Sequence, residues 1–286
     1  MNSVRNINYK FHRKINIKCG KYELNLGTRT FIMGILNITP DSFSDGGEFN
    51  DVDAAIKHAL DMVKEGVDII DVGGESTRPG AVEVDADEEI RRVLPVVKRL
   101  VKEVDLPISV DTYKSKVAEE VLKAGAHIIN DVWGLQSDPD IATVAAKYDV
   151  PVIVMHNQKG IEYKKDILEE ICDFFKKSID IALKAGVKKE NIILDPGIGF
   201  GKTPKQNMIV MSRLGELNDL GYPILLGTSR KSMIGKILDL PPKERVEGTV
   251  ATTVMGIVQG VDIVRVHDIK ENLRAAKVTD AIVRGL

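Results

Sequence analysis

The chain has 286 residues, of which 40 are basic and 42 acidic, so its formal net charge is −2. This balance argues against a protein that its overall field draws to nucleic acid or to an anionic membrane, and any anion it binds requires a local cluster of cations. Hydrophobic residues make up 43% of the chain, enough for a large core. The length suits either one barrel-sized domain or two smaller ones.

The cysteines and the start of the chain predict a cytoplasmic protein. Cys19 and Cys172 stand far apart and in no metal-binding spacing, which favours free thiols in a reducing compartment. The first thirty residues have no continuous apolar stretch and no small-residue cleavage pattern, and we expect no signal peptide. No window reaches the roughly eighteen uninterrupted apolar residues of a membrane helix.

Residues 1–30 precede the regular part of the chain and carry a weak alternation of apolar residues around Gly20-Lys21. The alternating residues are Ile15 and Ile17, then Tyr22, Leu24 and Leu26. Alternation on both sides of a glycine turn predicts a β-hairpin. Its position suggests that it covers the bottom of the domain that follows.

From residue 31 one rhythm runs to the C-terminus: a short β-branched apolar run, a loop rich in glycine and polar residues, then an amphipathic helix. Eight strands are predicted, at 31–36, 67–72, 107–110, 126–130, 150–155, 191–195, 223–227 and 261–266. Strands that are apolar throughout are buried on both faces, as are parallel strands joined by helices.

Eight such units predict an α/β fold, a (β/α)8 TIM barrel with a short N-terminal β-hairpin. The chain is then a single domain over 1–286, with the hairpin in 1–30 and the barrel in 31–286. A doubly wound open sheet is the alternative, although no glycine-rich dinucleotide or Walker signature follows any strand.

The segments between the strands have apolar residues at a spacing near 3.6, which predicts helices that pack on one face. In the first of them Ile56 and Ala59 share a face, and Asp51 or Asp53 is the expected N-cap. Pro95 lies inside the second predicted helix and is expected to kink it, because proline lacks a backbone donor.

Polar side chains follow all eight predicted strands, where barrels of this kind place their active sites. In chain order they are Asn37; Asp71 with 75–80; Asp111; Asn130 and Asp131; His156; Asp195; 229–232; and Arg265 with His267. One such residue would be ordinary, because an Asp at a strand end often caps a helix. Eight strands that all end in this way predict a binding site at the mouth of the barrel.

The candidate residues divide by charge. Asp111 and Asp195 suit a flat nitrogen heterocycle, because a carboxylate accepts two parallel hydrogen bonds from an amino group and the adjacent ring N–H, and Asn130 adds an amide. Three cationic candidates follow strands seven and eight, where such barrels commonly hold phosphate: Lys231, Arg265 and His267. We therefore predict a nitrogen heterocycle linked to a phosphate or diphosphate.

Some candidates keep an alternative interpretation. The loop 37–47 is rich in polar side chains, and Asn37 can ligate a hard cation or hold an anion, but it can also be a plain strand-to-helix connection. His267 can face the mouth together with Arg265, two positions earlier, or can simply start a helix beside Asp268. For His156 a structural and a functional interpretation both stay open.

The ordered motifs resemble those of the dihydropteroate synthases, a pterin-binding family. They are 37–47 (Asn-Ile-Thr-Pro-Asp-Ser-Phe-Ser-Asp-Gly-Gly), 73–80 (Gly-Gly-Glu-Ser-Thr-Arg-Pro-Gly), 109–112, 130–131, 195–202 (Asp-Pro-Gly-Ile-Gly-Phe-Gly-Lys), 227–232 and 265–268. The first two are long and specific, and the others are short but follow in the right order. The resemblance covers residue 31 to the end.

The resemblance implies a barrel transferase of folate biosynthesis. Such an enzyme joins (7,8-dihydropterin-6-yl)methyl diphosphate to p-aminobenzoate and gives 7,8-dihydropteroate and diphosphate. It also implies Mg²⁺ as cofactor, a homodimer, and an enzyme of the kind that sulfonamides target.

The resemblance further implies a role for each matching residue. The pterin is held by Thr77, Asp111, Asn130, Asp195 and Lys231, with Arg265 stacked on the ring. The diphosphate is bound by Arg265, His267 and Asn37, the last together with Mg²⁺. The p-aminobenzoate pocket is shaped by Phe43, Asp45, Arg78, Pro79 and Ser232.

The expected mechanism is an SN1-like substitution at the pterin methylene, in which cations stabilise the departing diphosphate. Asp45 is expected to stabilise the pterin cation and to order the first loop. Two alternatives share the pterin-binding residues: a methyltransferase that serves a corrinoid protein, which does not need the cluster of cations, and a non-catalytic relative that has lost its loops.

Overall fold

The structure is a computed structural model that describes residues 14–38, 47–76 and 83–285. Its first elements are two antiparallel strands, β1 (Ile15–Cys19) and β2 (Tyr22–Leu26). Gly20 follows β1 with a φ of +62°, a left-handed conformation that suits glycine in a tight turn. The predicted N-terminal hairpin is therefore confirmed.

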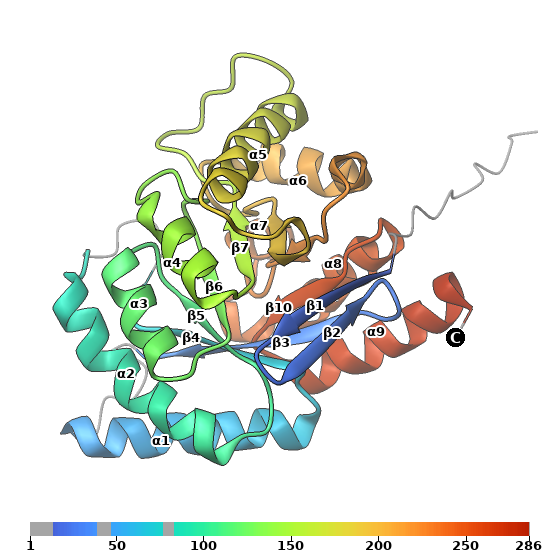
Figure 1. The fold of residues 1–286 in the computed structure, drawn as a ribbon. Helices are drawn as coiled ribbons and strands as arrows, with labels where there is room; N and C mark the ends of the chain where they lie inside the picture. Colours follow the sequence, from blue (N-terminus) through green and yellow to red (C-terminus); the bar gives the residue numbers. More distant parts are fainter. Residues whose placement is uncertain (1–13, 39–46, 77–82, 286) are drawn as a thin grey trace, which may run out of the picture.

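Eight parallel strands follow and form one sheet (Figure 1). They are β3 (Phe31–Asn37), β4 (Ile69–Gly73), β5 (Ile108–Asp111), β6 (Ile128–Asp131), β7 (Val152–Met155), β8 (Ile192–Asp195), β9 (Leu225–Leu226) and β10 (Ile263–Val266). The strand order is β8-β7-β6-β5-β4-β3-β10-β9, and a parallel bridge between Leu194 and Ile224 joins the two edges. The sheet is thus a nearly closed barrel, and the alternative of a doubly wound open sheet is wrong.

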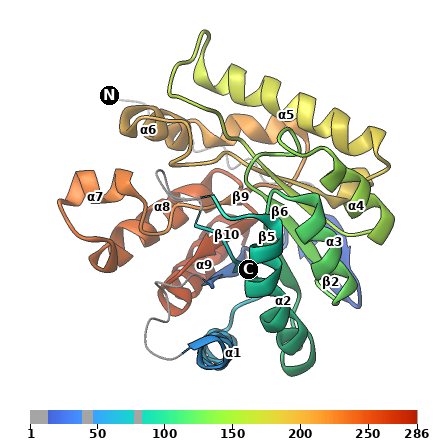
Figure 2. The same ribbon diagram turned by 90° about the vertical axis from the view of Figure 1, so that its left-hand side faces the viewer.

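The helices surround the sheet, as Figures 1 and 2 show. They are α1 (Gly47–Glu65), α2 (Ala86–Glu103), α3 (Ser115–Lys123), α4 (Asp140–Tyr148), α5 (Ile167–Lys184), α6 (Pro204–Ser212), α7 (Ser232–Leu238), α8 (Val246–Val258) and α9 (Ile269–Arg284). Short 3₁₀ segments lie at Lys189–Asn191, Leu214–Leu220 and Pro242–Glu244. Within the described ranges, none of the helices combines the length and the apolar character that a membrane crossing requires.

Helix ends follow local side-chain chemistry in part. Asp85 caps α2 by accepting a hydrogen bond from the backbone N–H of Glu88, as a good N-cap does. The expected cap of α1 is wrong, because the helix already begins at Gly47 and both Asp51 and Asp53 lie inside it. Apolar spacing identifies the buried face of a helix but not its first turn. The kink at Pro95 stays a prediction, and α2 continues past this residue to Glu103.

The hairpin closes the bottom of the barrel, as its position suggested. Its buried side chains belong to one apolar cluster with inward-facing strand residues near the amino ends of the strands. The cluster contains Ile17, Cys19, Leu24 and Leu26 of the hairpin and Phe31, Met33, Ile69, Ile128, Ile153, Ile193, Leu225 and Ile263 of the barrel. Alternate strand residues such as Ile32, Ile70 and Ile129 belong to the outer cluster under the helices. The hairpin therefore leaves the carboxyl ends of the strands uncovered.

Candidate active site

Arg265 on β10 joins two carboxylates at the carboxyl end of the barrel. Its Nε donates to Oδ2 of Asp71 at 2.6 Å, and its Nη2 donates to Oδ2 of Asp111 at 2.8 Å. The Nδ2 of Asn130 donates to the same oxygen of Asp71 at 3.1 Å. Asp71 is fully buried and Asp111 and Asn130 nearly so. Side chains from β4, β5, β6 and β10 thus meet at one point inside the mouth.

Asp71 and Asp111 each keep an oxygen for another donor. The Oδ1 atoms of both carboxylates are buried and have no hydrogen-bond partner among the described residues. A buried acceptor without a donor is costly, so a ligand that supplies an N–H here gains that free energy. Burial raises the pKa of Asp111, and the negative charge of Asp71 adds to this effect while Arg265 opposes it.

Asp195 at the end of β8 is the third buried carboxylate of the mouth. Its Oδ1 accepts a hydrogen bond of 2.8 Å from the backbone N–H of Gly197. Burial raises the pKa of Asp195 to about 6, although the charges of Lys231 and Arg265 act in the opposite direction. A Cβ atom added to Gly227, just beyond β9, would lie 3.8 Å from Oδ2 of Asp195, so this glycine lies beside the carboxylate.

Lys231 lies at the entry to α7, against the turn that follows Asp195. Its Nζ is 4.1 Å from the centre of the Phe200 ring, a cation–π distance. A Cβ atom on Gly199 would lie 3.0 Å from Cδ of Lys231. Neither Asp71 nor Phe200 had a predicted role in binding or catalysis. Asp71 had only its position at a strand end, and Phe200 only its place in the 195–202 motif.

The loops after β9 and β10 hold Lys231 and His267 in place. Ser229 accepts a hydrogen bond of 3.1 Å from the backbone N–H of His267, and its Oγ lies 2.9 Å from Nδ1 of the same residue. Arg230, whose φ is +57°, forms an ion pair with Asp268. Arg245 donates to the backbone carbonyl of Arg230 at 2.9 Å. The backbone around Lys231 and His267 is therefore held by hydrogen bonds and an ion pair to side chains of other segments.

Asn37 at the end of β3 is the candidate metal ligand. A Cβ atom on Gly73 would lie 3.6 Å from Oδ1 of Asn37 and 3.7 Å from Cβ of Asp111, so Asn37 is close to the carboxylate pair. Within the described parts of the chain no three His, Cys, Asp or Glu side chains gather to hold a metal. The amide oxygen of Asn37 nonetheless fits Mg²⁺, which often takes one protein oxygen together with substrate phosphates and water.

The remaining candidates differ in what the structure says of them. Ser232 is the first residue of α7 and is exposed beside Lys231. His156, just beyond β7, is buried and lies 2.8 Å from Nζ of Lys202 through its Nδ1. Five predicted residues lie outside the described parts of the chain: Phe43, Asp45, Thr77, Arg78 and Pro79.

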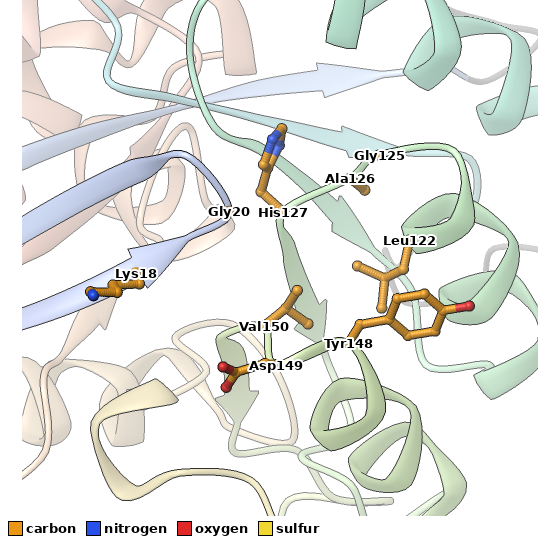
Figure 3. Close-up of a pocket in the computed structure, with 9 residues that line it drawn as sticks. All are labelled: Lys18, Gly20, Leu122, Gly125, Ala126, His127, Tyr148, Asp149 and Val150. Atoms are coloured by element: carbon orange, nitrogen blue, oxygen red, sulfur yellow. The ribbon is translucent and has the colours of Figure 1, made fainter.

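A cavity of about 450 Å³ lies at the other end of the barrel (Figure 3). Its lining combines Lys18 and Gly20 of the hairpin with residues at the amino ends of β6 and β7, among them His127 and Val150. None of its lining residues belongs to the predicted site. The polar residues of the mouth, not this cavity, therefore define the candidate active site.

Comparison with known proteins assigns the family. Residues 33–267 match the model of a family described as pterin binding enzymes. The dihydropteroate synthase of Clostridium beijerinckii is 61% identical over 269 residues, which cover 94% of this chain and 100% of the relative. That of Bacillus subtilis is 55% identical and the match covers 91% of each chain.

Solved structures agree with these relatives. A dihydropteroate synthase from Clostridium difficile, crystallised in the presence of pteroic acid, has a TM-score of 0.89 and 65% identity, with 91% of this chain and 98% of that chain covered. The Xanthomonas albilineans enzyme with 4-aminobenzoic acid has a TM-score of 0.90 and 41% identity, with 94% and 98% covered.

The fold and the buried carboxylates around Arg265 are those of a barrel enzyme that binds a pterin, and the chain belongs to the pterin-binding enzymes. Within them it belongs to the dihydropteroate synthases, transferases of folate biosynthesis. The resemblance seen in the sequence motifs is thus confirmed, and the family of these relatives disfavours the corrinoid methyltransferase.

The raised pKa of Asp195 predicts a pH dependence of pterin binding. Its ionised form accepts N–H donors, and because its pKa is about 6 and not near 4, this form is lost as the pH falls through about 6. The affinity for a pterin should fall about tenfold between pH 7 and pH 5. Calorimetric titrations across this range measure it. Burial also raises the pKa of Asp111, so part of the dependence belongs to that carboxyl. Asp195→Asn should bind weakly and show a smaller pH dependence than the unaltered protein, whereas an unaltered protein with constant affinity down to pH 5 would contradict the assignment.

Proposed function

We propose that this chain joins dihydropterin diphosphate to p-aminobenzoate and releases 7,8-dihydropteroate and diphosphate. The observation that carries the proposal is the pair of buried carboxylates, Asp111 and Asp195: Arg265 donates a hydrogen bond to the first, and its charge acts on the second. The amino and ring N–H groups along one edge of a pterin are donors, and Asp111 offers them an unpaired buried oxygen. Pteroic acid and 4-aminobenzoic acid in the similar solved structures support the same choice of substrates.

In the proposed complex the pterin lies inside the mouth. Asp111, Asn130 and Asp195 bind its polar edge, with Lys231 and Thr77 as further contacts. Arg265 stacks on the ring, for which a planar guanidinium is suited. Its two hydrogen bonds, to Asp71 and Asp111, support this role because they fix the plane of the guanidinium.

The diphosphate is proposed to lie toward the cations, on Arg265, His267 and Asn37. Mg²⁺ held by Asn37 and the diphosphate would neutralise negative charge on the leaving group. The aminobenzoate pocket is proposed to use Ser232, at the entry to α7, together with Phe43, Arg78 and Pro79. The two substrates then meet with the pterin methylene between the buried carboxylates and the p-aminobenzoate pocket.

The proposed mechanism is SN1-like. The C–O bond between the methylene and the diphosphate breaks first, and both electrons leave with the diphosphate, which the cations stabilise. The ring nitrogens spread the positive charge of the remaining pterin cation, and Asp45 is proposed to stabilise it further. The neutral arylamine then attacks the methylene and afterwards loses a proton. An aniline-type nitrogen is nucleophilic at pH 7, so this step requires no strong base.

The direct test of the function is an assay of released diphosphate. With dihydropterin diphosphate, p-aminobenzoate and Mg²⁺ we expect diphosphate and 7,8-dihydropteroate in equal amounts. A sulfonamide should compete with p-aminobenzoate, as the sulfonamide complex of the similar Yersinia pestis enzyme suggests.

Asp111→Asn should weaken pterin binding by at least about tenfold, because the amide cannot accept both N–H donors. Pterin binding without release from the unaltered protein would favour a non-catalytic relative.

Asp45→Ala tests the proposed stabilisation of the pterin cation. It should lower kcat by about a hundredfold and leave the affinity for dihydropterin diphosphate almost unchanged, because the charge that Asp45 stabilises develops only during the reaction. Rapid-quench kinetics and calorimetry measure the two quantities. Asp53→Ala, an exposed position in α1, is the matched control and should retain both. Equal turnover in Asp45→Ala and the unaltered protein would remove the role of Asp45.

We also propose a cytoplasmic homodimer. Both cysteines are unpaired in the described structure, which suits a reducing compartment. Large apolar side chains on α8 and α9 support a contact between subunits: Met255 is 51% exposed, Val278 63% and Ile282 70%. Sedimentation velocity at micromolar concentration should give about twice the chain mass, and Val278→Glu should shift the protein toward the monomer. A monomer at every concentration would refute the dimer.

A further inference from the structure

A buried lysine, Lys202, holds the glycine-rich turn 197–201 by hydrogen bonds and has no role in the proposed mechanism. Lys202 is only 7% exposed. Its Nζ donates to the backbone carbonyl of Gly197 at 3.0 Å and to that of Phe200 at 3.0 Å, and it lies 2.8 Å from Nδ1 of His156. An ammonium has three N–H donors, and this site offers three acceptors around it.

His156 is fitted to accept from this ammonium. Burial and, to a smaller extent, the charge of Lys202 together lower its pKa to about 2, so the imidazole is neutral and can offer the lone pair of Nδ1. The ring is enclosed by Phe174, whose centre is 4.8 Å away in an edge-on arrangement, and by Tyr163 at 6.3 Å. The Lys202 ammonium is therefore hydrogen-bonded to a buried imidazole just beyond β7.

Other contacts hold the same turn against β7. The hydroxyl of Tyr163 donates to the carbonyl of Gly201 at 2.9 Å, and the backbone N–H of Gly199 donates to Oδ1 of Asn207 at 2.7 Å. A Cβ atom on Gly197 would lie 1.9 Å from the carbonyl oxygen of His156, so the backbone of the turn packs directly against the backbone of His156, and a side chain at position 197 would clash.

The turn leads into the active site on its other side. The backbone N–H of Gly197 orients Asp195, and Gly199 and the Phe200 ring both lie against Lys231. The two carbonyl groups that Lys202 binds, at Gly197 and Phe200, are therefore on the residues that touch Asp195 and Lys231.

We propose that Lys202, whose ammonium is hydrogen-bonded to His156, is a positioning residue for the reaction: it fixes the turn 197–201 so that Asp195 and Lys231 lie where the pterin requires them. It touches no substrate itself. The inference rests on the proposed function, because the positions it fixes matter only if Asp195 and Lys231 serve the reaction. The proposal also gives His156 a role, as the acceptor of a hydrogen bond from the Lys202 ammonium.

The test replaces Lys202 with Met, which keeps the length of the side chain and removes its donors. For Lys202→Met we expect a folded protein, faster amide hydrogen exchange in the peptide covering 195–203, about tenfold weaker pterin binding and about tenfold lower kcat, since small misplacements of a site residue cost this much or more. Lys205→Met, an exposed lysine of α6, is the matched control and should change none of these quantities.

A double-variant cycle separates positioning from a purely structural role. If Lys202 acts through Asp195, Lys202→Met should weaken pterin binding much less in the Asp195→Asn background than in the unaltered protein. Equal losses in both backgrounds, or pterin affinity and kcat within about threefold of the unaltered protein, would overturn the proposal. Failure of the unaltered protein to release diphosphate would instead count against the proposed function.

Should Lys202→Met not fold, Lys202→Gln, which retains two N–H donors on a shorter chain, is measured in the same way. If neither variant folds, Lys202 serves the stability of the barrel and the positioning role is refuted.

Discussion

The double ion pair of Arg265 with Asp71 and Asp111 is the constraint on which the rest of the mouth depends. Two buried carboxylates this close would repel each other, and burying either alone would be costly. One guanidinium binds both, and the hydrogen bond from Asn130 adds a fourth side chain to the group. Because the four come from β4, β5, β6 and β10, the group also links four of the eight strands of the barrel.

This network divides the mouth into two chemical regions. Oδ1 of Asp71 and Oδ1 of Asp111 are buried and have no hydrogen-bond partner among the described residues, so a heterocycle can supply the donors that they lack. Lys231 follows β9 and His267 follows β10, on loops held by Ser229, Arg245 and the ion pair of Arg230 with Asp268. A ligand with a donor edge and an anionic tail suits both regions at once. Neither region alone would distinguish a pterin diphosphate from a simple heterocycle or a simple phosphate.

The sequence was sufficient to predict the barrel, because each buried strand is mainly apolar and a polar residue lies at its end or directly after it. Asp111, Asn130 and Arg265 could be placed together because the carboxyl ends of barrel strands share one rim. The particular bonds could not be predicted: that Arg265 pairs with Asp71 as well as Asp111 depends on side-chain directions across the barrel. The contact of Lys202 with His156 joins positions 46 residues apart, and neither residue carries a motif that indicates the other.

The start of α1 shows a different limit. The apolar spacing correctly predicted the buried face with Ile56 and Ala59. It could not predict at which residue the helix begins. Phe200 shows the same limit for function, since its relation to Lys231 becomes visible only when the turn after Asp195 is folded.

A crystal structure of the chain with a bound pterin diphosphate analogue tests the central claim most directly. The account predicts a pterin edge within hydrogen-bonding distance of Oδ1 of Asp111 and of the carboxylate of Asp195, with the Arg265 guanidinium against the ring and the phosphates toward His267. A pterin bound elsewhere, for example in the cavity beside His127, with these carboxylates left untouched, would contradict it.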